Sequence, residues 1–193
     1  MKPLTIAVDV DGPTADLHSE WLRLYNQDYD DDMTVEDITQ WEMPPLVKPE
    51  CGVKILDYLD IPTLYDNIKP TKGAFEGIEY LRALGHRIVF NSSCVIDRSD
   101  EKLHWLIKHG FVKSTNKYFF NDWMVVTDKS LINADILIDD RPKNIKDFKG
   151  LGILFDEPYN QGVLCDARLK SWKNIPDVIT SLFNSEYEEV VYG

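Results

Sequence analysis

The sequence predicts an α/β fold, in which a parallel β-sheet is covered by helices on both faces. Short apolar runs that read as buried strands, such as residues 5–8 and 136–138, alternate with stretches of helical periodicity. Glycines mark the ends of helical stretches, as Gly85 does after the apolar pattern of residues 70–84. This alternation favours parallel strands, because each helix returns the chain to the same end of the sheet.

The first strand is the clearest one. Residues 5–8 are apolar and partly β-branched, and the run closes at Asp9-Val10-Asp11-Gly12, where the glycine predicts a turn. After the turn, Thr14 is expected to cap a helix that runs to about Asn26. In that helix we expect Trp21 to belong to the core rather than to contact a substrate.

Residues 33–66 carry short, broken helical patterns, which three prolines between residues 44 and 49 interrupt. We interpret them as a small helical cap over the site rather than as a second domain. A chain of 193 residues is short enough for one domain with an insertion. We therefore expect a single domain over residues 1–193, with a core of about 1–14 and 70–193 and a helical cap insertion of about 15–69.

The rest of the chain continues the alternation. Residues 70–85 predict a helix whose buried stripe is Phe75, Ile78, Leu81 and Leu84. A strand at 87–90 ends at Asn91-Ser92-Ser93, and Ser99 is expected to cap a helix that Gly110 ends. The remaining expected elements are strands at 124–126, 136–138 and 153–155 and a closing helix at 176–183.

Composition argues against several classes of protein. Apolar residues make up 44% of the chain, enough to bury a core, and no apolar stretch is long enough to span a bilayer. The net charge of −12 argues against a nucleic-acid polymer as partner, since binding one needs a basic surface. The first strand leaves no room for a signal peptide, and the three cysteines are expected to be reduced thiols rather than disulfide or metal ligands. We therefore expect a cytoplasmic protein with no membrane partner.

Acidic residues follow two predicted strands that are far apart in the sequence. Asp9 and Asp11 close the first strand, and Asp139 and Asp140 close the strand at 136–138. If the two strands are neighbours, these residues meet at the carboxyl edge of the sheet, where open α/β folds bind ligands. They could share a hard cation such as Mg²⁺ there. The alternative for Asp9 and Asp11 is a role as turn or cap residues, although unpaired carboxylates beside an apolar strand are costly.

The order of the motifs resembles the haloacid dehalogenase superfamily, and its 5'(3')-deoxyribonucleotidase family in particular. The superfamily combines an early DxDG, a strand ending in Ser or Thr, a lysine, and a late strand ending in two aspartates, and this chain has them in that order. The resemblance runs from about Leu4 to about Trp172 and is patchy between residues 27 and 70. It is narrowed to the nucleotidases by Thr127-Asp128-Lys129-Ser130, residues 133–142, Ala15-Asp16, Glu101-Lys102 with Trp105, and Phe155 with Asn160-Gln161.

The resemblance implies a fold and a chemistry. The fold is a three-layer, Rossmann-like parallel sheet of the haloacid dehalogenase type, with a small helical cap inserted after the first strand. Asp9 would be the nucleophile that forms an aspartyl-phosphate, and Asp11 would protonate the leaving oxygen and then activate water. That role favours a raised pKa of Asp11, whereas nearby Mg²⁺ and Lys129 would lower it. The implied cofactor is Mg²⁺, held by Asp9, the backbone carbonyl of Asp11 and Asp139, with Asp140 acting through a metal-bound water.

The phosphate-binding residues follow from the middle motif and the lysine. Lys129 would pair with the phosphoryl oxygens and with Asp9. The family typically has a Thr-Ser pair after the strand, whereas this chain has Asn91-Ser92-Ser93. Ser92 is our choice for the phosphate-binding hydroxyl, Asn91 can fill the threonine position and donate through its amide, and Ser93 remains open.

Substrate contacts are expected under the cap, where aromatic side chains of the family stack on the base. Leu17 stands where the family often has an aromatic residue, and the aromatic candidates are Trp41, Tyr58 and Tyr65. Each of the three could instead belong to the core of the cap. Arg141 is weighed equally as an exposed loop cation and as a residue at the entrance of the site.

The implied function is that of a Mg²⁺-dependent phosphatase. It would hydrolyse a small-molecule partner, a deoxyribonucleoside 5'(3')-monophosphate, to deoxynucleoside and phosphate. Two alternatives stay open: a phosphatase of the same superfamily for another small phosphate monoester, and a non-catalytic regulator that binds nucleotides. A homodimer is compatible with the resemblance, and the sequence fixes neither the preferred base nor the choice between 5' and 3' phosphate.

Overall fold

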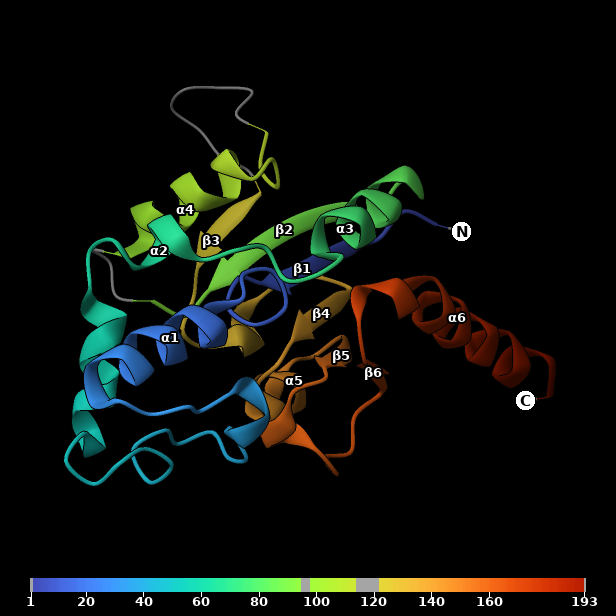
Figure 1. The fold of residues 1–193 in the computed structure, drawn as a ribbon. Coiled ribbons are helices and arrows are strands. Elements are labelled where there is room, and N and C mark those ends of the chain that lie inside the picture. Colours follow the sequence, from blue (N-terminus) through green and yellow to red (C-terminus); the bar gives the residue numbers. More distant parts are fainter. Residues whose placement is uncertain (1, 95–97, 114–121, 193) are drawn as a thin grey trace.

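The computed structural model describes residues 2–94, 98–113 and 122–192, with side chains up to residue 183. Within these residues, six strands form one parallel sheet in the order β3-β2-β1-β4-β5-β6 (Figure 1). The first strand, β1 (Thr5–Asp9), lies in the middle, between β2 (Arg87–Ser92) and β4 (Ile136–Asp139). The outer strands are β3 (Trp123–Val125), β5 (Leu151–Phe155) and β6 (Ala167–Leu169). The predicted α/β fold class is confirmed.

Side chains along each strand alternate between two apolar layers. Ile6 and Val8 of β1 belong to one layer, whereas Ala7 belongs to the other. Helices α3 (Ala74–Ala83), α4 (Ser99–Lys108) and α6 (Ile175–Tyr192) cover the first layer, and α5 (Pro142–Asp147) covers the second. Because the central strands are buried on both faces, their sequences read as continuous apolar runs.

Residues 15–69, which we call the cap segment, leave the sheet after β1 and return before α3. The two ends of the segment lie side by side: Ala15 forms an antiparallel bridge with Pro70, just beyond the segment, and the Asp16 N–H donates to the Lys69 carbonyl at 2.9 Å. In Figure 1 the segment lies on the side toward which the strand arrows point, and Trp21 lies in a separate apolar cluster within it. Its elements are α1 (Leu17–Tyr29), the 3₁₀ helices η1 (Val35–Asp37) and η2 (Gly52–Asp60), and α2 (Leu64–Asn67).

The start of α1 differs from the prediction. Asp16, not Thr14, is the N-cap, and its carboxylate accepts a hydrogen bond from the Ser19 N–H at 3.3 Å. Thr14 is fully buried instead, and its hydroxyl donates to the Asp9 carbonyl at 2.7 Å. The hydroxyl of Thr14 therefore braces the loop after β1, which a capping role would not allow.

The buried stripe of α3 is narrower than predicted. Ile78 and Leu81 are fully buried, but Phe75 and Leu84 are 42% and 40% exposed. Gly77 is one of the buried positions on this helix. A small residue is needed there because the helix packs closely on Trp172, so the apolar pattern overestimated the width of the stripe.

Three further differences lie in short or irregular pieces. The strand β6 was not predicted, because it is only three residues long and contains Arg168, so it has no apolar run. The closing helix was expected to end near residue 183 but continues to Tyr192. Ser99 is the first residue of α4, and Arg98 holds the N-cap position. Among the described residues, no helix combines the length and apolar character needed to cross a membrane.

Trp172 joins α3 to the loop that follows β1. Its side chain is 1% exposed, and its indole N–H donates to the Pro13 carbonyl at 2.6 Å. A Cβ at Gly77 would lie 2.4 Å from Cε3 of this indole. The glycine therefore leaves the space in which the indole reaches the loop.

We expect Gly77→Ala to lower the free energy of unfolding by about 1–3 kcal/mol, even though alanine is the better helix former. The reason is that the buried indole must move away from the new methyl group. Urea unfolding measures the change.

Glu76→Ala, an exposed position on the same helix, is the control and should change the unfolding free energy by no more than about 0.5 kcal/mol. If Gly77→Ala were as stable as the parent protein, the close packing of Trp172 would not limit stability.

Candidate active site

The carboxyl ends of β1, β2 and β4 lie side by side. Asp9 pairs in register with Asn91 of β2, and Val8 pairs with Ile138 of β4, which puts Asp9 beside Asp139. Residues paired in register across parallel strands point to the same face of the sheet. The polar residues therefore gather at one edge, where open α/β sheets bind ligands.

The loop after β1 turns sharply at Gly12. This glycine has a φ of 83°, and a Cβ there would lie 2.6 Å from Oδ2 of Asp140. Glycine is needed for the left-handed backbone and for the close approach of Asp140. The turn carries Asp11 past the end of the strand, so that Asp9 and Asp11 have different partners.

Lys129 is buried between two carboxylates. It begins the 3₁₀ helix η4 (Lys129–Leu131), and its ammonium lies 2.7 Å from Oδ1 of Asp9 and 2.5 Å from Oδ2 of Asp139. Burial opposes the charged form of the lysine, but the two carboxylates outweigh it and raise its pKa above the usual range. Asp139 also accepts hydrogen bonds from the Arg141 backbone N–H at 2.9 Å and the Asn144 amide at 3.0 Å.

Asp9, Asp139 and Asp140 form a compact set of buried carboxylates. Each offers an oxygen within 4.8 Å of the others. Burial raises the pKa of Asp9 to about 7, with Lys129 opposing the shift and Asp139 and Asp11 adding to it. Burial and repulsion from Asp139 and Asp9 also hold the pKa of Asp140 well above its usual range. One lysine does not balance three such carboxylates, and a hard divalent cation with oxygen ligands fits the set.

Asp11 has the opposite electrostatic setting. Nζ of Lys102 on α4 lies 2.5 Å from its Oδ2, and the hydroxyl of Tyr65 on α2 donates to its Oδ1. Burial acts to raise the pKa of Asp11, but the charge of Lys102 and the two hydrogen bonds outweigh it and hold the pKa below its usual range. Of the two opposing influences expected on the pKa of Asp11, the lowering one prevails, and its main source is Lys102 rather than Lys129.

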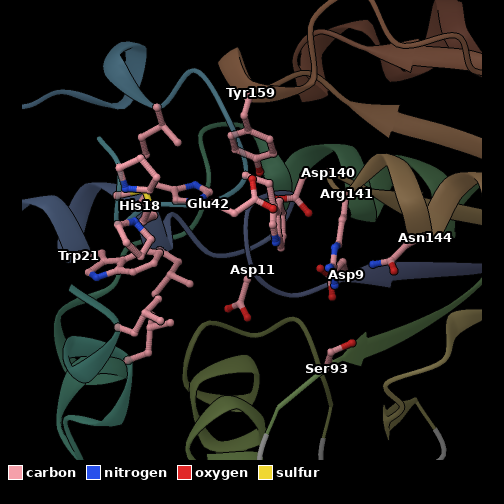
Figure 2. A pocket seen from close by; sticks show the side chains of 18 of the residues that line it. Asp9, Asp11, His18, Trp21, Glu42, Ser93, Asp140, Arg141, Asn144 and Tyr159 are labelled. Atoms are coloured by element: carbon pink, nitrogen blue, oxygen red, sulfur yellow. The ribbon is translucent and has the colours of Figure 1, made fainter. Parts of the chain in front are cut away.

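A cavity of about 620 Å³ opens between these residues and the cap segment (Figure 2). Its inner end is polar and includes Asp9, Asp11, Lys129 and Asp140. Its outer end is mostly apolar and comes from the cap segment, with Leu17, Trp21, Trp41, Met43, Leu56 and Leu59. A small molecule with one anionic end and one apolar or aromatic end fits such a cavity.

Tyr159 joins the two ends of the cavity from the 3₁₀ helix η5 (Pro158–Asn160). Its hydroxyl donates to Oδ2 of Asp140, and its ring lies edge-on to those of Trp41 and His18, each at 5.5 Å between centres. The Arg141 guanidinium lies 4.5 Å from the centre of the Trp41 ring, within cation–π range. Tyr159 and Arg141, which lie outside the cap segment, thus hold Trp41 at the mouth of the site.

The four predicted substrate residues divide into two pairs. Leu17 and Trp41 line the cavity, whereas Tyr58 and Tyr65 do not. Tyr58 is 9% exposed in the apolar cluster of the cap segment, and its hydroxyl donates to Asp28 at 2.7 Å, which corrects the expectation that it faces the substrate. Tyr65 is turned toward Asp11 instead.

The middle motif has its three polar residues in three settings. Asn91 is fully buried, and its side-chain nitrogen and oxygen have no hydrogen-bond partner among the described residues. Ser92 is 1% exposed, and its hydroxyl accepts a hydrogen bond from Lys102 at 2.7 Å. Ser93 lines the cavity, and its hydroxyl donates to the Val126 carbonyl at 3.0 Å. The geometry therefore favours Ser93 over Ser92 as the hydroxyl open to a phosphate.

Sequence reasoning assigned no role to Lys102, Asn144 or Tyr159. Lys102 was noted as part of the resemblance, but no local pattern links it to Asp11, 91 residues earlier. Asn144 and Tyr159 follow β4 and β5 by a few residues, in the helices that begin at the carboxyl edge of the sheet. Polar residues shortly after a strand end were the available signal.

Comparison with known proteins agrees with this geometry. The model of the family described as 5' nucleotidase, deoxy (pyrimidine), cytosolic type C protein (NT5C) matches residues 2–184 of the chain. The chain belongs to this family. A 5'(3')-deoxyribonucleotidase of Clostridium acetobutylicum is 32% identical over 183 residues, which are 94% of this chain and 98% of that protein. The nucleotidase resemblance drawn from the motifs is confirmed, and the matched region contains every site residue named above.

Solved structures of hydrolases share the fold at low sequence identity. A HAD family hydrolase of Deinococcus radiodurans with bound phosphate and sodium has a TM-score of 0.61 at 12% identity, covering 92% of this chain and 95% of that one. A HAD hydrolase of Bacillus subtilis bound to magnesium has a TM-score of 0.55 at 14% identity, covering 93% and 100%. These matches confirm the haloacid dehalogenase-like fold.

Acidic side chains of the cap segment lie close enough to Glu157 to repel its negative charge. Burial raises the pKa of Glu157 to about 7, and repulsion from Asp16, Asp156 and Glu36 adds to the shift. Asp16 and Glu36 belong to the cap segment, whereas Glu157 follows β5. The ionised form of Glu157 is therefore unfavourable in the folded protein.

We expect Glu157→Gln to stabilise the protein at about pH 8 but not at about pH 4. Because the pKa of Glu157 is raised in the folded protein, its carboxylate does not destabilise the fold below about pH 4.5, the ordinary pKa value. The destabilisation is complete above about pH 7. The gain in unfolding free energy should grow across this window to at most about 3 kcal/mol. Urea unfolding at a series of pH values measures it.

Glu50→Gln removes an exposed acid of the cap segment and is the matched control. Its effect on stability should be small and similar at each pH. A Glu157→Gln effect that did not vary with pH would mean that the carboxylate is not the source of the penalty.

Proposed function

We propose that the protein hydrolyses deoxyribonucleoside 5'(3')-monophosphates to deoxynucleoside and inorganic phosphate, with Mg²⁺ as cofactor. The observation that carries the proposal is the inner end of the cavity, where Asp9 lies against Lys129 and beside two further buried carboxylates. The apolar, aromatic outer end supports a substrate that carries a base. The name of the Clostridium acetobutylicum relative supports the same substrate class.

In the first step, Asp9 attacks the phosphorus of the monoester. The bond from its carboxylate oxygen to phosphorus forms while the bond from phosphorus to the ester oxygen breaks, and Asp11 protonates the leaving oxygen. Lys129 reduces the repulsion between the nucleophile and the phosphoryl oxygens.

In the second step, a water oxygen attacks the phosphorus of the aspartyl-phosphate and passes a proton to Asp11. The bond between phosphorus and the Asp9 oxygen breaks, so that phosphate leaves with the original carboxylate restored. The two steps need carboxylates with separate partners, and the contacts of Asp9 with Lys129 and of Asp11 with Lys102 support that division.

The donors at the inner end suit Mg²⁺. The carboxylates of Asp9, Asp139 and Asp140 and the backbone carbonyl of Asp11 would hold it, with Asp140 acting through a water. When bound, the ion supplies positive charge to the carboxylates and to the phosphoryl oxygens. The Asn144 amide and Lys129 fix the orientation of Asp139 for this purpose.

The remaining contacts divide along the cavity. Ser93 and Lys129 bind the phosphoryl oxygens, whereas the deep burial of Asn91 and Ser92 favours indirect roles for both. Leu17 and Trp41 contact the sugar and base.

We also propose that the protein works in a reducing compartment, as expected for the cytoplasm. Its three cysteines are free thiols, and Cys51 is buried in the cap segment. Reducing conditions keep such thiols unpaired.

Phosphate release from a panel of monophosphates tests the function. We expect turnover of dUMP and dGMP to exceed that of UMP and GMP by about ten- to a hundred-fold in kcat/KM, because an apolar pocket rejects an added hydroxyl only to this extent. Asp9→Asn should abolish turnover of all of them, because an amide cannot form the aspartyl-phosphate.

Equal rates on ribonucleotides would leave only a general phosphatase. An Asp9→Asn variant within a few-fold of the parent would remove the nucleophile assignment. Binding of nucleotides with no phosphate release would instead identify a regulator.

We expect the melting temperature to depend on the metal. Mg²⁺ should raise the melting temperature and EDTA should lower it, because the ion relieves repulsion among the three carboxylates only in the folded state. Activity should follow the same titration.

Asp140→Asn should weaken the effect of Mg²⁺ on the melting temperature, whereas Asp57→Asn, an exposed position on the cap segment, should leave it unchanged. Full activity in EDTA would contradict the metal proposal.

A further inference from the structure

We propose that Lys102 and Tyr65 are positioning residues for the second half of the reaction, in which Asp11 takes a proton from the attacking water. The inference rests on the proposed function and adds to it a pair of residues outside the cavity. Both act through Asp11, since neither lines the cavity in which the substrate would lie.

The contacts leave both oxygens of Asp11 occupied. Its Oδ2 lies 2.5 Å from Nζ of Lys102, and its Oδ1 accepts a hydrogen bond from the Tyr65 hydroxyl. The ring of Tyr65 also faces the lysine, since Nζ of Lys102 lies 5.5 Å from the centre of that ring. A carboxylate held at both oxygens keeps one orientation.

Such a hold is needed because of where Asp11 lies. It follows the end of β1 by two residues, and its side chain is 25% exposed at the cavity. In Figure 2 it is drawn between the cap residues His18 and Trp21 and the group around Asp9. A carboxylate on a loop with no fixed partner would rotate among its rotamers, and a general base loses efficiency when it is not within hydrogen-bond reach of the water.

The two positioning residues are themselves fixed. The side chain of Lys102 is 7% exposed, and its Nζ also donates to Ser92 Oγ at 2.7 Å. On the same helix, the Trp105 indole N–H donates to the Ile68 carbonyl at 2.9 Å, and the ring of Trp105 lies edge-on to that of Tyr65. Helix α4 thus holds the returning end of the cap segment, which carries Tyr65, against the loop that carries Asp11.

Lys102 and Lys129 would serve different steps of the reaction. Lys129 lies on Asp9 and Asp139, so its loss would impair formation of the aspartyl-phosphate. Lys102 lies on Asp11, so its loss should impair breakdown of that intermediate. The two steps can be observed separately with p-nitrophenyl phosphate, whose leaving group departs as a stable anion and needs no proton from Asp11.

The test is Lys102→Met assayed with p-nitrophenyl phosphate. We expect kcat to fall about 10²-fold while kcat/KM stays within about three-fold, because kcat/KM reports only the steps up to release of p-nitrophenolate. Rapid mixing should show a burst of p-nitrophenolate equal to the enzyme concentration, and intact mass should show the phosphorylated protein. Tyr65→Phe should show the same split with a smaller fall in kcat, about ten-fold.

Two controls make the outcome specific. Lys108→Met removes an exposed lysine from the same helix and should leave both constants unchanged. In an Asp11→Asn background, Lys102→Met should cause no further fall beyond about three-fold, because residues that act through one group are not additive.

An equal fall in kcat and kcat/KM, without a burst, would overturn the inference and place Lys102 in phosphate binding or in the general packing of the site. Unchanged kcat in both Lys102→Met and Tyr65→Phe would overturn it as well. If the parent protein released phosphate from p-nitrophenyl phosphate but not from any nucleotide, the proposed substrate would fail while the positioning role could still be measured.

Discussion

The site depends on the placement of Lys129 between Asp9 and Asp139. The ammonium lies within 2.7 Å of both carboxylates, and its side chain is 1% exposed, so water neither solvates nor screens the group. Removing one member of such a buried pair typically costs about 3–5 kcal/mol, because the remaining charge is left unpaired. The arrangement requires β1 and β4 to be neighbours, which brings Asp9 and Asp139 together, and it requires η4 to present the lysine to their face.

The loop after β1 links the site to distant parts of the chain through contacts of Gly12 and Pro13. Gly12 lets Asp140 approach to a distance that a Cβ would block, and Thr71 donates to the Gly12 carbonyl at 2.6 Å from just beyond the cap segment. Trp172 holds the neighbouring Pro13 carbonyl from the opposite end of the chain. The hydrogen bond from Trp172 to Pro13 joins residues that are 159 positions apart in the sequence. Loop geometry and core packing cannot change independently here.

The sequence predicted the strands that have an apolar run and the pairs of acidic residues that follow two of them, because both features depend on local pattern. Buried parallel strands are continuous apolar runs, so β1, β4 and the acids that follow them could be recognised, as could the order of motifs that gave the family. Contacts between distant elements had no such pattern. Tyr58 and Tyr65 have the same aromatic character as Trp41, and only the packing of η2 and α2 turns the first toward Asp28 and the second toward Asp11. Likewise Ser92 and Ser93 are the same residue type, yet Ser92, the last residue of β2, is buried, whereas Ser93, just beyond the strand, lines the cavity.

The two aspartates of the DxD motif end in opposite settings, and this bears on how one site can serve two steps. A regular strand would keep both on one face, but the chain turns after Asp9, where the Ala15 N–H donates to the Val10 carbonyl at 2.7 Å. Asp9 stays with Lys129 and has a raised pKa of about 7, whereas Asp11 reaches Lys102 and has a lowered pKa. A divalent cation at the carboxylates would favour the ionised form of Asp9, which ties the strength of the nucleophile to the metal. Lys102 favours the ionised form of Asp11 without any metal, and that form suits the step in which Asp11 accepts a proton from water better than the step in which it donates one.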